Sequence, residues 1–173
     1  METTAIKLSK SGKKSFEKGD FETAIQSFSD AAKIYYDEEN FLDAAEEKNN
    51  LSVSLLQAER AKESLEAALG TDLVFAEAKD WLRQAMALGN QAAALDVLGQ
   101  SEEALETYAN SAALFREVGE GDLEATVLKS IAAIKLRSGK LQETAYTMLD
   151  SLGATQKPNL FQRFIKFILR IIR

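Results

Sequence analysis

The chain of 173 residues contains no cysteine and no histidine. Without cysteine there can be no disulfide, thiolate metal site or cysteine nucleophile. Without histidine the chain lacks the usual general base, the commonest zinc ligand and the side chain that titrates near neutral pH. No Gly-rich phosphate loop follows a strand, and no strand is evident. The sequence therefore predicts a protein that is not an enzyme and that has no metal site and no cofactor.

Secretion signals and excess positive charge are also missing. The first seven residues contain no apolar run of the kind found in a signal peptide, and a cysteine-free chain without such a signal is typical of the cytoplasm. The formal net charge of −6 argues against a nucleic-acid partner. A hydrophobic content of 46% is that of a folded domain, so the sequence predicts a soluble binding or structural protein.

The charge is unevenly distributed around the single proline, Pro158. Four of the 21 basic residues and none of the 27 acidic residues follow it, so residues 1–157 carry about −10 and residues 158–173 about +4. A second basic cluster lies near the N-terminus, where such a run is either a solvated helix face or a contact for an acidic partner. Its members are Lys7, Lys10, Lys13, Lys14 and Lys18.

A repeat of 40 residues organises the first 157 residues. Glycines at 19, 99 and 139 precede similar segments, and Glu59 occupies the remaining register. Glycine takes the left-handed conformation at a helix end at little cost, so each of these positions predicts a turn between two helices. The expected helices are 3–18, 21–37, 41–58, 61–69, 73–98, 101–117, 121–138 and 141–152. Gly70 and Gly89 predict a shortened helix and a bend in the middle of the chain.

Small residues recur on both sides of each turn. They stand seven residues before it and five residues after it, where they let two antiparallel helices approach closely. Larger residues nine positions after the turn, such as Phe28, Tyr108 and Met148, are expected to fill the space between the helices. The small residues are Gly12, Ser52, Ala92 and Ala132 before the turns, and Ala24, Ser64, Ala104 and Thr144 after them.

This spacing of small residues around a turn resembles the tetratricopeptide repeat. The resemblance covers residues 3–157 and implies an all-α, right-handed solenoid of four helix-turn-helix units whose first helices line a concave groove. It places seven candidate partner-binding residues in that groove: Lys10, Lys13, Asn49, Asn50, Asn90, Lys129 and Ser130. Asn50 and Asn90 each offer a donor and an acceptor to an extended peptide backbone, and the alternative is that they bond neighbouring helix ends or face water.

The segment from Lys48 to Leu55, with its Asn49-Asn50-Leu51 core, is similar to the first helix of kinesin light chain repeats, which are also longer than usual. The length of the chain and of its repeat resembles the small bacterial kinesin light chain homologues. That resemblance implies binding to a bacterial tubulin polymer and to membranes. A generic bacterial tetratricopeptide adaptor is the alternative.

The last 14 residues predict a basic amphipathic helix. Read as a helix, residues 160–173 place four basic side chains and Gln162 on one side and nine apolar residues over an arc of about 200°. A helix of this length is about 21 Å long, too short to cross a bilayer core of about 30 Å. The expected membrane-binding residues are Phe161, Arg163, Phe164, Ile165, Lys166, Phe167, Ile168, Leu169, Arg170, Ile171, Ile172 and Arg173.

Three uses of this segment remain open on sequence grounds. It can lie in a membrane interface with its basic residues on lipid phosphates, cap the last repeat, or form an oligomer contact. A cap needs an apolar stripe of only about 100°, so the wider arc favours the membrane. Acidic runs such as Asp37-Glu38-Glu39 and Glu46-Glu47 lack calcium-loop spacing and are expected to face solvent.

Together these patterns predict two parts, a repeat solenoid over residues 1–157 and a basic amphipathic helix over residues 158–173. The expected function is that of an adaptor in the cytoplasm, attached peripherally to the inner face of the cytoplasmic membrane. The solenoid would hold a protein partner, for which the resemblance suggests bacterial tubulin, and the tail would bind anionic lipid or self-associate. The alternative is a soluble scaffold whose C-terminal helix is a cap or an oligomerisation contact.

Overall fold

A computed structural model describes residues 3–155 of the chain, and every described element is helical. The expected all-α fold is therefore confirmed, whereas the predictions for residues 158–173 concern residues outside the described part. The helices are α1 Thr4–Glu17, α2 Phe21–Asp37, α3 Phe41–Gln57, α4 Ala61–Ala68, α5 Thr71–Glu77, α6 Trp81–Val97, α7 Ser101–Val118, α8 Gly121–Arg137 and α9 Leu141–Ala154.

Seven turns at intervals of 20 residues set the length of the helices. Each has one residue in the left-handed region, with φ between 57° and 82°. In the first turn the Gly19 N–H donates to the Phe16 carbonyl at 2.9 Å, and the Asp20 N–H donates to the Ser15 carbonyl at 2.9 Å. The other six turns repeat this pair of bonds, which satisfies carbonyls that a helix end leaves free. The left-handed residues are Gly19, Glu39, Glu59, Lys79, Gly99, Gly119 and Gly139.

The small residues lie where the helices of each pair touch. All eight of the predicted small positions are buried, which confirms that the paired helices approach closely. In the second unit the hydroxyls of Ser52 on α3 and Ser64 on α4 lie 3.0 Å apart. A further column that the sequence analysis did not identify is also buried in every first helix: Ala5, Ala45, Ala85 and Ala125. Met148 departs from expectation, because its side chain is 55% exposed while Phe28 and Tyr108 are buried.

The second unit contains a break that divides its second helix. Gly70, with φ of 79°, separates α4 from α5, as its position in the sequence predicted. The break exposes the carbonyl of Ala68, which accepts hydrogen bonds from the Thr71 hydroxyl at 2.7 Å and from Gln91 Nε2 at 3.1 Å. Gln91 also donates to Asp72 Oδ1 at 2.7 Å, so side chains from α5 and α6 compensate for the lost helical bonds.

The prediction of one helix over 73–98 is wrong, because a turn lies at Lys79. The side chain of Asp80 accepts a bond from the Arg83 N–H at 3.0 Å and so begins α6. Gly89 lies inside α6 without interrupting it. A lysine gives no signal for a left-handed turn, which is why the sequence pattern passed over this position.

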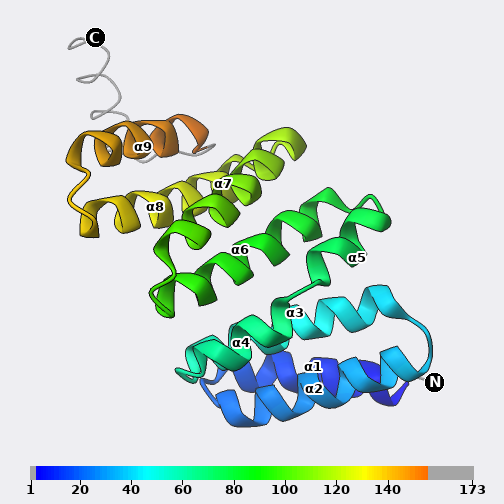
Figure 1. Cartoon of the computed structure of the whole chain (residues 1–173). Coiled ribbons are helices and arrows are strands. Elements are labelled where there is room, and N and C mark those ends of the chain that lie inside the picture. The colour runs from blue at the N-terminus through cyan, green and yellow to red at the C-terminus, as the bar shows by residue number, and fades with distance from the viewer. Residues whose placement is uncertain (1–2, 156–173) are drawn as a thin grey trace.

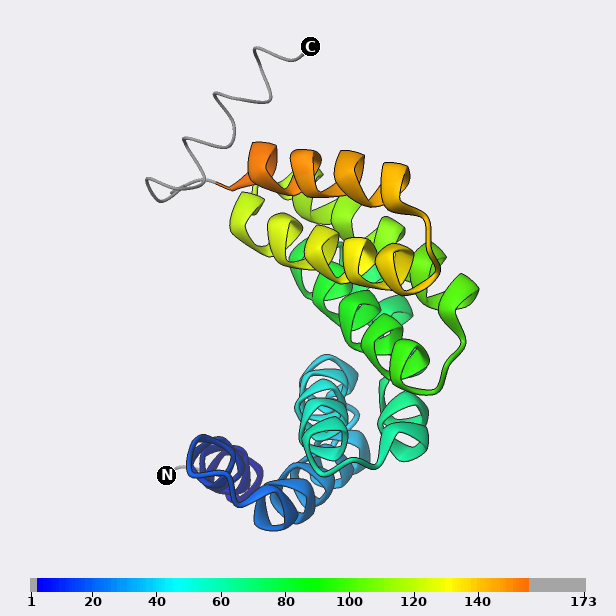
Figure 2. The same ribbon diagram turned by 90° about the vertical axis from the view of Figure 1, so that its left-hand side faces the viewer.

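The helix pairs are stacked along one direction, with the N-terminus and α9 at opposite ends (Figure 1). The first helices of the four pairs are α1, α3, α6 and α8, and the second are α2, the divided α4 and α5, α7 and α9. Figure 2 shows that the stack bends between the N-terminal pairs and the C-terminal pairs. Within the described residues, no helix has the length and apolar character that crossing a membrane requires.

Candidate protein-binding groove

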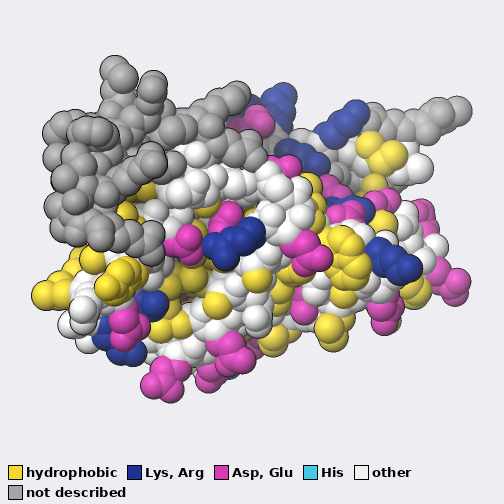
Figure 3. All heavy atoms as spheres, turned by 90° about the horizontal axis from the view of Figure 1, so that it is seen from above, with side chains coloured by type: hydrophobic (Ala, Val, Ile, Leu, Met, Phe, Trp, Pro, Cys, Tyr) yellow, Lys and Arg dark blue, Asp and Glu magenta, His cyan; other side chains and the backbone are white. Residues whose placement is uncertain are grey.

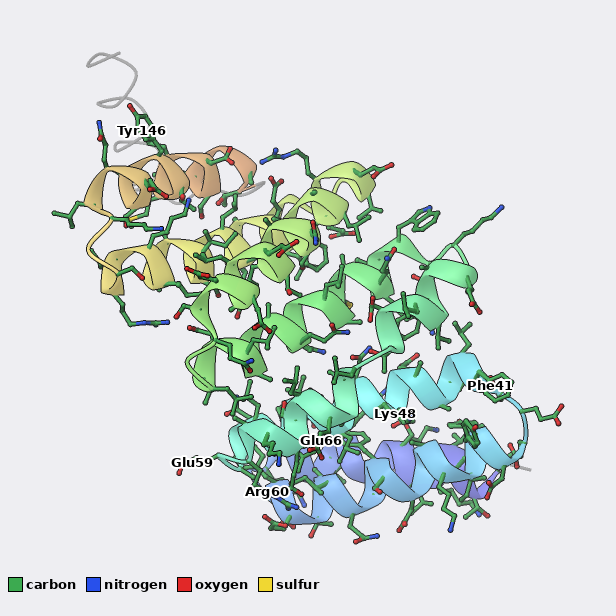
Figure 4. The ribbon with its side chains drawn as sticks, in the orientation of Figure 1. Phe41, Lys48, Glu59, Arg60, Glu66 and Tyr146 are labelled. Carbon is green, nitrogen blue, oxygen red and sulfur yellow. The ribbon has the colours of Figure 1, made fainter. Side chains whose placement is uncertain are left out.

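The surface formed by α1, α3, α6 and α8, here called the first-helix face, carries the predicted partner-binding residues. Lys10, Lys13 and Lys129 are exposed on it, and Asn50 and Asn90 are partly exposed. Over the face drawn in Figure 3, acidic and basic side chains are interspersed. Lys48, which begins the motif of the second unit, is exposed on α3 (Figure 4).

Two of the predicted residues take part in packing between helices. Asn49 is buried, and its Oδ1 accepts a hydrogen bond from the Thr71 hydroxyl at 3.2 Å. The break at Gly70 allows α5 to cover this part of α3, so Asn49 is turned toward the protein interior. Ser130 is partly buried and makes a side-chain hydrogen bond with Tyr108. These contacts tie the first-helix face to the helices behind it.

Lys13 and Asn50 meet at a pocket between α1, α2 and α3. The pocket has a volume of about 220 Å³. Its floor is apolar because Gly12 has no side chain, so the ring of Phe28 lies directly against α1. The lining residues are Lys13, Phe16, Glu17, Phe28, Asn50 and Val53. The structure therefore brings together one predicted residue from the first unit and one from the second.

Buried polar atoms lie one helical turn from this pocket. Glu47 is 4% exposed, and its Oε1 accepts a hydrogen bond of 2.6 Å from the Ser9 hydroxyl. Its Oε2 and the Nδ2 of Asn50 are buried without a partner in normal hydrogen-bond geometry. A buried polar atom without a partner is uncommon and costly, so this donor and acceptor are available to a ligand or to water.

Burial raises the pKa of the Glu47 carboxyl above its ordinary value. Hydrogen bonds from Ser9 and Asn50 and the charge of Lys13 oppose this rise without cancelling it. The expectation that the Glu46-Glu47 run faces solvent is therefore wrong for Glu47. A sequence signal was present, because the equivalent residues of the third and fourth units are Ala87 and Val127, both buried.

Glu46 connects the first helices of three successive units. Its carboxylate lies 3.7 Å from Lys13 Nζ on α1 and 3.0 Å from Arg83 Nη1 on α6. Arg83 also pairs with Asp80 at 2.7 Å, and its guanidinium lies 5.0 Å from the ring centre of Phe75. Glu46 is 39% exposed, so each pair contributes little to stability, and its main effect is to orient the long side chains beside the pocket.

Among the described residues, no group of three or more acidic, histidine or cysteine side chains could hold a metal ion. The polar groups of the first-helix face are amides, hydroxyls and isolated ion pairs that run along several helices. Such a surface suits recognition of an extended segment, which gains affinity from backbone hydrogen bonds and specificity from alternate side chains.

The paired helices, the 40-residue period and the groove-lining first helices define a tetratricopeptide-like solenoid, a class of protein-interaction scaffold. Two solved structures are similar to it, those of a putative kinesin light chain from Podosopora anserina with nearly identical TPR-like repeats and of a single-substitution variant of that protein. Each has 14% sequence identity and a TM-score of 0.74, covering 88% of this chain and 76% of the other. At this identity the likeness shows the fold, which confirms the predicted solenoid.

The family follows from the sequence profile of the soluble NSF attachment proteins, SNAP, which matches residues 3–138. The chain belongs to this family. No curated protein sequence is significantly similar to the chain. The sequence analysis reached the repeat class but not this family, because turn and packing positions are common to many helical repeat proteins.

Proposed function

We propose that the protein is a non-enzymatic adaptor that holds an extended segment of a protein partner on its first-helix face and attaches to anionic membrane through residues 158–173. The observation that carries the protein-binding half is the unpartnered pair of Glu47 Oε2 and Asn50 Nδ2 beside the pocket. A peptide group has one N–H donor and one carbonyl acceptor, which complement this acceptor and donor.

The pocket supports the same interpretation by its size and lining. Its 220 Å³ is below the usual range of small-molecule sites, so it suits a single side chain better than a whole metabolite. Phe16, Phe28 and Val53 supply an apolar lining, and Asn50 supplies the polar group at its edge. An apolar side chain would enter the pocket while its own backbone amide bonds to α3.

The membrane half of the proposal depends on the composition of residues 158–173. Four basic residues and no acidic residue stand among nine apolar ones. Each basic residue near an anionic surface contributes about 1 kcal/mol, and burying even half of the apolar side chains adds several kcal/mol before ordering costs. Such a balance gives reversible attachment, and the proposed location is the inner face of the cytoplasmic membrane.

The partner that the proposal favours has an acidic surface, such as that of a tubulin-like polymer. The lysines of α1 and Lys18 just after it are exposed, and Glu17 is the only acidic residue among them. Charges of one sign on an exposed helix attract a partner of the opposite sign and speed its association. Sedimentation with assembled bacterial tubulin, at low and at high salt, tests this choice of partner. Salt-sensitive co-sedimentation supports it, and its absence removes tubulin from the proposal.

Flotation with vesicles tests the membrane half. The full chain is mixed with vesicles that contain or lack phosphatidylserine, and a variant with Arg163, Lys166, Arg170 and Arg173 changed to glutamine is compared with it. Loss of four basic contacts should weaken binding to anionic vesicles by about two to three orders of magnitude. The matched control changes Lys7, Lys10, Lys14 and Lys18 to glutamine, which alters the net charge equally and should leave flotation nearly unchanged.

Equal effects of the two sets of substitutions would show that binding follows net charge and not the C-terminal segment. Failure of the full chain to float with either vesicle would remove the membrane half of the proposal. The remaining candidate is then a soluble scaffold whose C-terminal segment is a cap or an oligomer contact. That candidate draws on a separate observation, the exposed apolar residues of α9.

A further inference from the structure

The outer side of α9 presents an apolar stripe that no described residue covers. Leu141 is 68% exposed and Met148 is 55% exposed, and Ala145 between them is also exposed. These residues stand at intervals of four and three, so they form one row along the helix. The stripe defined by Leu141, Ala145 and Met148 is called the α9 stripe below.

In the inner units the same positions are covered. Phe28 on α2 and Tyr108 on α7 stand nine residues after their turns, as Met148 does on α9, and they are 2% and 6% exposed. The difference follows from the order of the stack, because α2 packs against α3 and α7 against α8, whereas α9 is the last described helix. The α9 stripe is thus the surface onto which one more helix would pack.

The chain supplies a segment that fits this surface. Residues 160–173 would be about 21 Å long as a helix, and α9, also of 14 residues, has the same length. The five residues 155–159 can reach about 17 Å, which exceeds the 8–10 Å between the axes of packed helices. The segment therefore reaches the α9 stripe and matches its length.

Charge also favours this contact. The acidic residues of α9 are Glu143 and Asp150, both exposed, and α9 has no basic residue. Residues 158–173 contain four basic residues and no acidic one. Glu143 and Asp150 already lie near Lys135 and Arg116, so their contribution is modest, but no like-charge repulsion opposes the approach.

The segment cannot pack as closely as a regular first helix. Each first helix has a buried alanine at the position of Ala5 and a small residue at the position of Gly12. Continued by the 40-residue period, these columns reach Ile165 and Ile172. Larger side chains at close-contact positions keep two helices further apart and reduce the area buried between them. A contact of this kind is shallow and can be released.

We propose that residues 158–173 lie on the α9 stripe when the protein is in solution. Where the segment also binds membrane, which rests on the function proposed above, the α9 stripe and lipid compete for the same apolar side chains. Attachment to membrane then uncovers the α9 stripe, and covering the α9 stripe limits attachment.

Hydrogen exchange on the full chain tests the contact, with Met148→Glu as the variant. Met148 is more than half exposed in the described structure, so the substitution should leave the solenoid folded. Wild-type amides after Pro158 should exchange at least about tenfold more slowly than those of the isolated 158–173 peptide. In Met148→Glu this protection should be lost, and flotation with phosphatidylserine vesicles should rise about threefold. The matched control is Val97→Glu, at an apolar residue of α6 that is 64% exposed, and it should behave as the wild type.

Three results would overturn the proposal. They are wild-type amides that exchange as fast as those of the free peptide, equal behaviour of Met148→Glu and Val97→Glu, and a wild-type dimer that Met148→Glu converts to a monomer, which would make a second copy the occupant. Loss of protection in Met148→Glu without flotation of any variant would support the contact and remove the membrane half of the proposed function. The two proposals therefore fail separately.

Discussion

A β-carbon on Gly12 would lie 2.6 Å from Cε1 of Phe28 and within 2.9 Å of two further atoms of the ring. The bare backbone of α1 thus forms one wall of the space that this ring fills. The same ring forms part of the lining of the pocket that Lys13 and Asn50 border. Packing of the first helix pair and the shape of the candidate site depend on the same contact.

Gly12→Ala should destabilise the protein although alanine is the better helix former. Overpacking of a buried site costs about 1–3 kcal/mol, which exceeds the gain of about 1 kcal/mol in helix propensity. The matched control is Gly153→Ala in α9, where an added β-carbon meets nothing within 4 Å and should be neutral or stabilising. Urea denaturation measures both, and a Gly12→Ala variant as stable as the wild type would contradict the packing described for Phe28.

Substitutions at the turns should have opposite signs at Glu59 and Gly99. Glu59 has φ of 63° and Gly99 has φ of 79°, so both occupy the conformation that side chains disfavour (Figure 4 labels Glu59). Glu59→Gly should gain up to about 1 kcal/mol in the free energy of unfolding, and Gly99→Ala should lose about 1–2 kcal/mol. Thermal unfolding of both variants checks the signs, and two shifts in the same direction would argue against a common turn geometry.

Glu47→Gln should change how stability depends on pH. Burial raises the pKa of Glu47 in the folded protein above the value of 4.5 for an unperturbed glutamate, so the folded protein binds this proton more tightly than the unfolded chain does. Stability from this group is present below pH 4.5 and is lost as the pH rises through the folded-state pKa. The variant should therefore be more stable relative to the wild type at pH 7 than at pH 4.

Denaturation at several pH values between 4 and 8 provides the measurement for Glu47→Gln. Glu66→Gln serves as its control, because it removes the same charge from an exposed position on α4. A stability difference between Glu47→Gln and the wild type that stays constant across this range would mean that the Glu47 carboxyl titrates alike in the folded and unfolded chains.

Gln91→Ala should weaken the junction between α4 and α5. The substitution removes the hydrogen bonds to the Ala68 carbonyl and to Asp72, and the loss of bonds at a buried site costs about 1–3 kcal/mol. The effect should be local, with faster hydrogen exchange in α4 and α5 than in α7 and α8. Gln142→Ala, at an exposed position of α9, is the control, and equal effects of the two substitutions would exclude a special role for Gln91.

The fold was predictable where the sequence marks its turns directly. Gly19, Gly99 and Gly139 are favourable left-handed residues, and the small residues around them identify the paired helices. Lys79 was not predictable, because its left-handed conformation is locally unfavourable. It is maintained by the packing of the helices on either side, where Phe75 and Ala85 are fully buried.

The site was predictable only in part, for a related reason. Lys13 and Asn50 come together because the 40-residue period aligns their helices. Glu47 resembles a solvent-facing residue when only its neighbours in sequence are considered, and its burial depends on Ser9, 38 residues earlier in the chain. Asn49 is covered by α5 because the chain breaks at Gly70, and the pattern of α3 alone contains no record of that break.

The uniform turn geometry has a consequence for the length of the molecule. Each 20-residue segment begins and ends in the same way, and the described helices pack mainly on their neighbours in the stack. One more pair of helices, inserted at a left-handed turn residue, would lengthen the first-helix face without altering the contacts on either side. The number of units therefore acts as a spacer that sets how far the lysines of α1 lie from the end of α9.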